Sequence, residues 1–131
     1  MLNRLRLEAH SIIADLKAGK DTIKILSDLN KCYPFAENDR ERAVHEALGA
    51  DNREYIERAA GLLTEGNAEG LGALMREVQE NFDKKVAPAS PKELAAPVLH
   101  SVLNDENLDK WIYGAKGVGS QGDGTVQLLA K

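Results

Sequence analysis

The sequence has only one cysteine, no long apolar run and no excess of basic residues. Its single cysteine, Cys32, excludes an internal disulfide and fits a reducing, cytoplasmic setting. No apolar run approaches the roughly 18 residues that a membrane-spanning helix needs. With 17 basic and 21 acidic residues the net charge is −4, so nothing favours nucleic acid or a membrane as a partner. The first ten residues are charged, and we expect no secretory signal there.

The composition that is present is typical of one globular domain. Apolar residues make up 43% of the 131 residues, which argues against disorder. The length predicts a single domain over residues 1–131, burying about two-thirds of its unfolded surface. The three histidines, His10, His45 and His100, lack the spacing of metal ligands, so no metal site is expected.

Apolar periodicity and capping residues predict the secondary structure of the first two-thirds of the chain. Residues 5–16 alternate as in a strand, although their composition leaves a helix open. A helix is expected over residues 22–32, and three further helices follow. Their expected boundaries are Asp21 as the first N-cap, Asp39 and Gly49 around a short helix, Asp51 with Glu54 as a capping box, Gly66 as a stop, and Asn67 as the last N-cap.

The last third predicts one more helix and then a hairpin. Ser90, followed by Pro91 and Glu93, is typical of a helix start. Residues 110–116 and 124–130 both alternate with period two, so we expect antiparallel strands, with Trp111 packed against the protein. The fold class expected is α+β, a small antiparallel sheet with helices on one face.

Five of the 11 glycines lie between Gly114 and Gly124, in the segment GAKGVGSQGDGT. Such loops either make tight turns or let the backbone approach an anion closely. The string from Gly117 to Gly122 matches the dinucleotide pattern G-x-G-x-x-G, but a strand pattern follows it where that motif needs a helix. No Lys-Ser/Thr pair follows the glycines, so a Walker loop is excluded as well.

The segment GAKGVGSQGDGTVQLLAK resembles the third motif of the GHMP small-molecule kinases, the superfamily of galactokinase and mevalonate kinase. Two upstream stretches, IIADLKAGKDTIKILSDLN and GLGALMREVQENFDKKVAPASPKELAAPVL, are similar to the same C-terminal domain in order and spacing. The positions matching the motif are Gly114, Ala115, Lys116, Gly119, Gly122 and Gly124, and the loop is completed by Gly117, Ser120, Gln121 and Asp123.

The resemblance implies a ferredoxin-like two-layer sandwich and a role in ATP-dependent phosphorylation of an alcohol, most reasonably on a sugar. It implies that Lys116 lies near a phosphate, where the alternative is a solvated hairpin lysine, and that Ser120 and Gln121 donate to a phosphate or sugar oxygen. Asp123 would contact a substrate hydroxyl or cap a turn through its own backbone. The family's ATP-phosphate loop, a Pro-x-x-x-Gly-Leu-Gly-Ser-Ser-Ala type string, is absent from these residues.

Several expectations follow from that missing loop. The sequence is expected to be a C-terminal piece of a longer kinase. ATP and magnesium would then be held mainly by an N-terminal domain, and this piece would bind neither firmly. No catalytic residue is assigned within it. The alternative is a stand-alone, non-catalytic ligand-binding or assembly module of the same fold.

Overall fold

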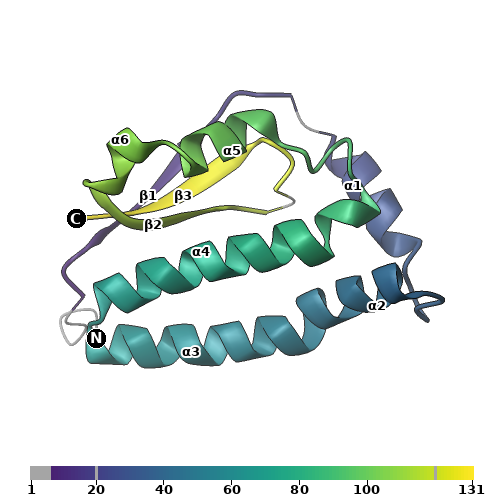
Figure 1. Ribbon diagram of the computed structural model, residues 1–131, viewed down its shortest axis with the longest axis horizontal. Helices are drawn as coiled ribbons and strands as arrows, with labels where there is room; N and C mark the ends of the chain where they lie inside the picture. The colour runs from purple at the N-terminus through teal and green to yellow at the C-terminus, as the bar shows by residue number, and fades with distance from the viewer. Residues whose placement is uncertain (1–6, 20, 120) are drawn as a thin grey trace.

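The computed structural model describes residues 7–19, 21–119 and 121–131. A strand opens the chain, helices follow, and a hairpin ends it (Figure 1). The elements are β1 (His10–Asp15), α1 (Thr22–Asn30), α2 (Asp39–Glu46), the π-helical turn η2 (Ala47–Asp51), α3 (Asn52–Glu65), α4 (Ala68–Lys85), the 3-10 turn η3 (Ala87–Ala89), α5 (Pro97–Leu103), α6 (Glu106–Asp109), β2 (Ile112–Gly117) and β3 (Thr125–Ala130). None of the helices in these ranges is both long and apolar enough to cross a membrane.

The strands form one antiparallel sheet in the order β1-β3-β2. The expected hairpin is confirmed, with Lys116 opposite Gln127 and Gly117 opposite Val126. The α+β class and the small antiparallel sheet are confirmed too. A ferredoxin-like layer has four strands in the order βαββαβ, and the described residues supply three of them. Strand β1 is shorter than the expected 5–16, of which residues 5 and 6 lie outside the described ranges.

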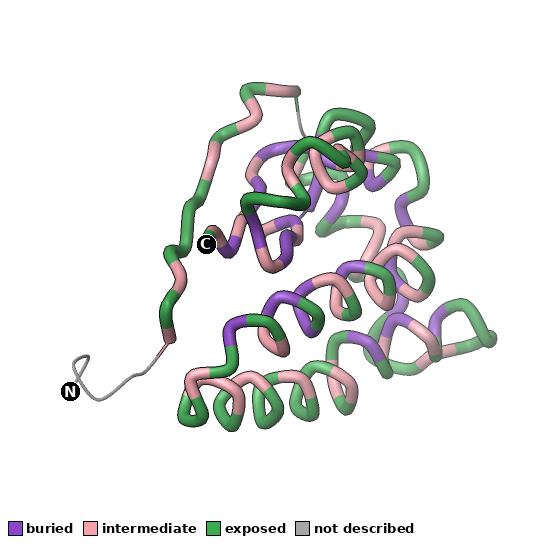
Figure 2. The backbone as a smooth tube through the Cα atoms, turned by 60° about the vertical axis from the view of Figure 1, so that its left-hand side comes forward, coloured by how far each residue is buried: buried purple, intermediate pink, exposed green. Residues whose placement is uncertain are grey.

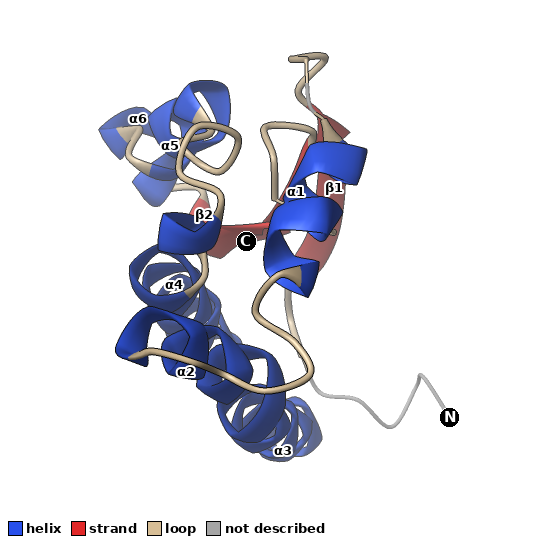
Figure 3. Ribbon diagram, turned by 90° about the vertical axis from the view of Figure 1, so that its right-hand side faces the viewer, coloured by secondary structure: helices blue, strands red, loops and turns tan. Residues whose placement is uncertain are grey.

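Helix α4 covers the free edge of β2, so helices do not lie on one face of the sheet alone. In Figure 1 β2 lies between β3 and α4, and Figure 3 shows α5 and α6 on the other side of β2. The Gly117 N–H points away from β3 and donates to Gln79 Oε1 on α4 at 2.7 Å. An uncovered strand edge is a pairing hazard, and a helix placed along it removes that hazard.

Two glycines allow this close approach. A Cβ atom added to Gly72 on α4 would collide with the Tyr113 carbonyl, and one added to Gly114 on β2 would collide with the backbone of Gly72. Helix and strand therefore meet backbone to backbone. This contact fixes the position of β2 along the axis of α4.

The buried side chains form two clusters. The first lies between α5 and the hairpin and contains Ala96, Leu99, Ile112, Ala115 and Val126. The second joins α1, η2 and the end of α4 through Ile25, Ala47, Val86 and Leu94. Figure 2 shows that burial concentrates along α4 and the hairpin, whereas β1 is largely exposed.

Several predicted caps are confirmed. The Asp21 carboxylate accepts from the Lys24 N–H at 2.9 Å, and the Asn67 side chain accepts from the Gly70 N–H at 2.8 Å. Gly66 ends α3 in the left-handed conformation, at φ 70°. Cys32 is a buried thiol, as expected.

The predicted break between Gly49 and Asp51 is wrong. The chain passes from α2 through the π turn into α3 without leaving helical geometry, and Asp51 makes no cap. Its carboxylate instead accepts from Lys85 Nζ at 2.7 Å and from Asn81 Nδ2 at 3.1 Å, both on α4. Asn38, not Asp39, is the N-cap of α2. A strong tertiary partner has replaced the local role that the sequence suggests for Asp51.

The predicted helix start at Ser90 is also wrong. The Ser90 hydroxyl donates to Asp28 Oδ2 at 2.8 Å instead of capping a helix, and residues 91–95 form turns. Helix α5 begins at Pro97, after Ala96 at φ 43°. Trp111 precedes β2 and is 65% exposed, which corrects the expectation that it packs inside. The short helix α6 was not anticipated.

Alanine at Gly72 or Gly114 should destabilise the fold. Each added methyl group meets backbone, which cannot rotate aside, so we expect a loss of about 1–3 kcal/mol or more in the free energy of unfolding. Gly61 is the matched control, because nothing lies within 4 Å of its added Cβ. Helix propensity should make Gly61→Ala neutral or more stable by up to about 1 kcal/mol. Urea unfolding of the three variants measures this, and equal stability of Gly72→Ala and wild type would contradict the close approach.

Candidate functional site

The glycine loop joins β2 to β3 and is tied down at several points. The Val118 N–H donates to the Thr125 carbonyl at 3.2 Å, and the Gln121 N–H donates to the Val118 carbonyl at 3.3 Å. The Leu16 N–H, just past β1, donates to the Gly124 carbonyl at 3.0 Å. The described part of the loop is therefore held to both neighbouring strands.

The loop's unusual backbone angles do not all fall on glycine. Gly119 has φ 68°, the conformation for which glycine is suited. Gln121 and Asp123 adopt it as well, at 61° and 63°. A non-glycine residue there costs about 1–3 kcal/mol, and such residues cluster at functional sites. The loop thus stores strain that its surroundings must offset.

The ten predicted site residues separate into three groups. Gly114, Ala115, Lys116 and Gly117 lie within β2, and Gly114 serves the contact with α4. Gln121, Gly122, Asp123 and Gly124 are buried. Gly119 is exposed, and Ser120 lies outside the described residues. Of the nine that the structure describes, Lys116, Gly119 and Gln121 line one cavity together.

Asp123 caps a helix that lies far from it in sequence. Its carboxylate accepts from the Leu99 N–H at 2.6 Å and from the Val98 N–H at 3.2 Å, in the first turn of α5. The residue before α5, Ala96, has no side-chain acceptor to offer. Free N–H groups at a helix start need an acceptor, and a carboxylate also suits the helix dipole. This cap is made across the fold and not on the turn of Asp123 itself, so it differs from the local cap that the sequence suggests, and contact with a substrate hydroxyl stays a prediction.

Lys116 is a half-buried cation. Its Nζ donates to the Gly117 carbonyl at 2.8 Å, and among the described residues it has no ion pair with a carboxylate. Burial lowers the pKa of Lys116 from its ordinary value of 10.5, because the charged form loses hydration. An ammonium in this setting would gain from a bound anion.

A cavity of about 210 Å³ opens beside Lys116, between α3, α4 and the loop. Its apolar wall includes Val78, Phe82 and Val86, and its polar groups come from Asn52, Tyr55, Asn81, Lys116 and Gln121. Gln121 is 8% exposed, and its Oε1 finds no hydrogen-bond donor among the described residues. A buried acceptor without a donor is costly. This atom lies on the Leu99 side of Gly117, because a Cβ added to Gly117 would meet Gln121 Oε1 at 2.9 Å and Leu99 Cδ2 at 2.8 Å.

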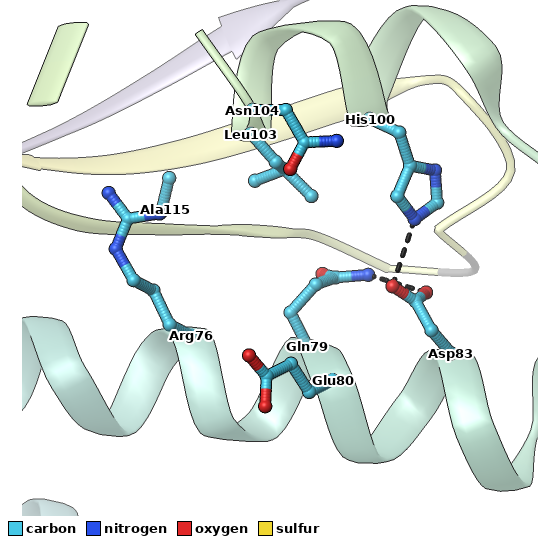
Figure 4. Close-up of a pocket in the computed structure, with 8 residues that line it drawn as sticks. All are labelled: Arg76, Gln79, Glu80, Asp83, His100, Leu103, Asn104 and Ala115. Atoms are coloured by element: carbon cyan, nitrogen blue, oxygen red, sulfur yellow. Dashed lines mark hydrogen bonds and ion pairs between the residues drawn. The ribbon is translucent and has the colours of Figure 1, made fainter. Parts of the chain in front are cut away.

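A second, smaller cavity of about 120 Å³ lies between α4 and α5 (Figure 4). His100 Nε2 lies 2.9 Å from Asp83 Oδ2, and His100 Nδ1 lies 2.8 Å from the Ala96 carbonyl oxygen. Gln79 Nε2 donates to Asp83 Oδ1 at 3.0 Å. Burial of the ring lowers the pKa of His100, but these two acceptors outweigh it, and the pKa is raised above 6.5.

Sequence reasoning missed Gln79, Asp83, Asn52 and Tyr55, and assigned no role to His100. One signal was available for Gln79 and Asp83. They lie four residues apart on α4, where side chains at i and i+4 meet, next to the apolar stripe of Leu74, Met75 and Val78. The partner His100 lies 17 residues further on, and no local pattern connects it to them.

No protein-family model matches the chain, and no curated protein matches it either.

The cap from Asp123 should be measurable in stability. Asp123→Gly relaxes the backbone at φ 63° but removes both acceptors, and we expect a net loss of about 1–2 kcal/mol. Asp123→Asn keeps one acceptor and tolerates the angle, so its loss should be smaller. Thermal and urea unfolding provide the comparison. A glycine variant as stable as wild type would mean that the carboxylate does not hold α5.

Proposed function

We propose that this chain is the glycine-loop domain of an ATP-dependent small-molecule kinase that phosphorylates an alcohol group, with a sugar as the expected acceptor. The loop from Gly117 to Gly124 would form one wall of the active-site cleft. Lys116 would meet the negative charge of a phosphate. The setting proposed for this activity is the cytoplasm.

The observation that carries the proposal is the state of Lys116. Its ammonium is half-buried, lacks a carboxylate partner among the described residues, and lies at a cavity that it shares with Gly119 and Gln121. Phosphoryl transfer depends mainly on positioning and on stabilising charge, rather than on covalent chemistry by the protein. A fixed, partly dehydrated cation beside a strained and tethered loop suits that task.

The proposal assigns the rest of the chemistry to a second domain. The ATP-phosphate loop of the kinases that the sequence resembles has no counterpart in these residues, so ATP and magnesium would be bound mainly elsewhere. The surface offers apolar side chains that such a domain could cover. Ile13 on β1 is 63% exposed and Ile23 on α1 is 82% exposed, as is Phe35. A contiguous exposed apolar patch is typical of a protein interface, whereas apolar residues exposed singly are ordinary.

The decisive experiment is phosphotransfer by the complete reading frame that encodes these residues. Purified protein would be offered Mg·ATP with a panel of sugars, mevalonate and homoserine, and ADP release would be followed in a coupled assay. Turnover on a sugar supports the proposal in full. If the 131-residue chain binds a small anion at Lys116 while the complete protein transfers no phosphate, the alternative of a non-catalytic ligand-binding module is favoured.

The 131-residue chain by itself should show no kinase turnover. The main ligands of the ATP phosphates and of magnesium are expected in the other domain, so the transition state would lack most of its charge stabilisation. ADP release with each acceptor should stay at the level of a protein-free control. Turnover well above that level, in a preparation free of host kinases, would contradict this division of labour.

Lys116→Met should impair catalysis in the complete enzyme. If the ammonium stabilises charge as the phosphoryl group transfers, kcat and kcat/KM should fall together by about 10² or more. If it merely binds ATP, KM should rise with kcat unchanged. Stability should stay the same or rise, because the variant removes a half-buried charge.

The matched control for Lys116→Met is Lys110→Met, an exposed lysine just before β2. Its kinetics should equal those of wild type. If Lys116→Met also has wild-type kinetics, the loop has no catalytic role through Lys116 and is a structural turn.

A further inference from the structure

A continuous chain of hydrogen bonds leads away from the base of the glycine loop through α4 into α5. The Gly117 N–H donates to Gln79 Oε1 at 2.7 Å, and Gln79 Nε2 donates to Asp83 Oδ1 at 3.0 Å. Asp83 Oδ2 lies 2.9 Å from His100 Nε2. The other ring nitrogen of His100, Nδ1, lies 2.8 Å from the Ala96 carbonyl oxygen. Figure 4 shows Gln79, Asp83 and His100 pointing toward one another from α4 and α5.

The chain of bonds returns to the same loop. Ala96 immediately precedes α5, and the first N–H groups of that helix donate to the carboxylate of Asp123. Gly117 at the start of the loop and Asp123 near its end are therefore connected both along the backbone and through α4 and α5. The strained residues Gln121 and Asp123 lie inside this ring.

We propose that Gln79, Asp83 and His100 are positioning residues for the glycine loop, and that they hold it most firmly when His100 carries its positive charge. Among the described residues, both partners of the His100 ring nitrogens are acceptors, a carboxylate and a carbonyl. An imidazolium donates to both, whereas a neutral imidazole has a single N–H. Loss of the proton must therefore break one of the two bonds.

The charged groups near His100 are of both signs. Arg76 and Glu80 on α4 line the same cavity, and Asp83 is the direct partner. Asp123 accepts from the N–H groups of Val98 and Leu99, which immediately precede His100 in α5. Hydrogen bonds to Asp83 and Ala96 raise the pKa of His100 despite its burial. The stability that the charged ring contributes is therefore fully present below 6.5, and it is lost as pH rises through the raised pKa.

The effect on loop order does not depend on the chain being a kinase, whereas its effect on phosphoryl transfer rests on the proposed function. A loop that must meet a transferring phosphate gains from being fixed beforehand, because charge stabilisation requires preorganised donors. On that basis kcat of the complete enzyme should fall as pH rises through the titration of His100. The affinity for ATP should depend less on the protonation of His100 than kcat does.

The test is an NMR titration of the 131-residue chain. The His100 ring resonances should titrate above pH 6.5, and the amides of Gly117 and Gly119 should inflect at the same pH. Above that pH the exchange protection of the Gly117 amide, corrected for intrinsic exchange, should drop about tenfold, as expected for one hydrogen bond. The proposal is overturned if the loop amides show no inflection at the midpoint pH of the His100 titration. This measurement uses the wild-type chain alone.

Two substitutions complete the experiment. His100→Gln retains an N–H donor toward Asp83 but cannot titrate, so the loop inflection should vanish. His10→Gln is the control, because His10 is exposed at the start of β1 and should leave the inflection unchanged. An inflection that persists in His100→Gln would refute the role of His100. The two proposals can fail separately. If the loop amides titrate with His100 but the complete protein transfers no phosphate, the proposed kinase activity is refuted and the positioning role of Gln79, Asp83 and His100 still holds.

Discussion

The contact between α4 and the free edge of β2 is the constraint on which the rest of the structure depends. Gly72 and Gly114 let the two backbones meet, and Gln79 accepts the edge N–H of Gly117. With β2 fixed against the longest helix, β3 and then β1 are aligned by pairing. The glycine loop then starts from a strand end whose position is set by α4. A larger side chain at either glycine would move the loop as well as the sheet.

This constraint also explains how the loop tolerates its strain. Gln121 and Asp123 hold left-handed backbone angles that an isolated turn would give to glycine. The surroundings of Asp123 offset its cost, because its carboxylate caps α5 with two hydrogen bonds. Gln121 shows no such compensation at Oε1, which has no donor among the described residues. The Asp123 end of the loop is therefore satisfied within the fold. The Gln121 end keeps a buried acceptor that no donor among the described residues satisfies.

Local signals in the sequence were sufficient for the hairpin and for the caps at Asp21, Asn67 and Gly66, because period-two alternation and short-range hydrogen bonds depend on neighbouring residues. They failed at Asp51 and Ser90, each of which bonds a partner more than 30 residues away instead of capping a helix. The site shows the same division. Lys116, Gly119 and Gln121 were identified from the loop, but Asn52 and Tyr55 reach the cavity from helix α3, which no motif connects to the loop.

The half-buried Lys116 and the unpartnered Gln121 Oε1 are hard to explain by stability alone. Methionine in place of the lysine would keep the apolar stem and avoid the loss of hydration that lowers the pKa of Lys116. A donor opposite Gln121 Oε1 would remove a second penalty. Lys116 and Gln121 both line one cavity, beside a loop that holds two non-glycine residues at positive φ and is bonded to β3, α5 and the residue after β1. The proposed function accounts for the Lys116 term, because a bound anion would stabilise the charge that burial disfavours.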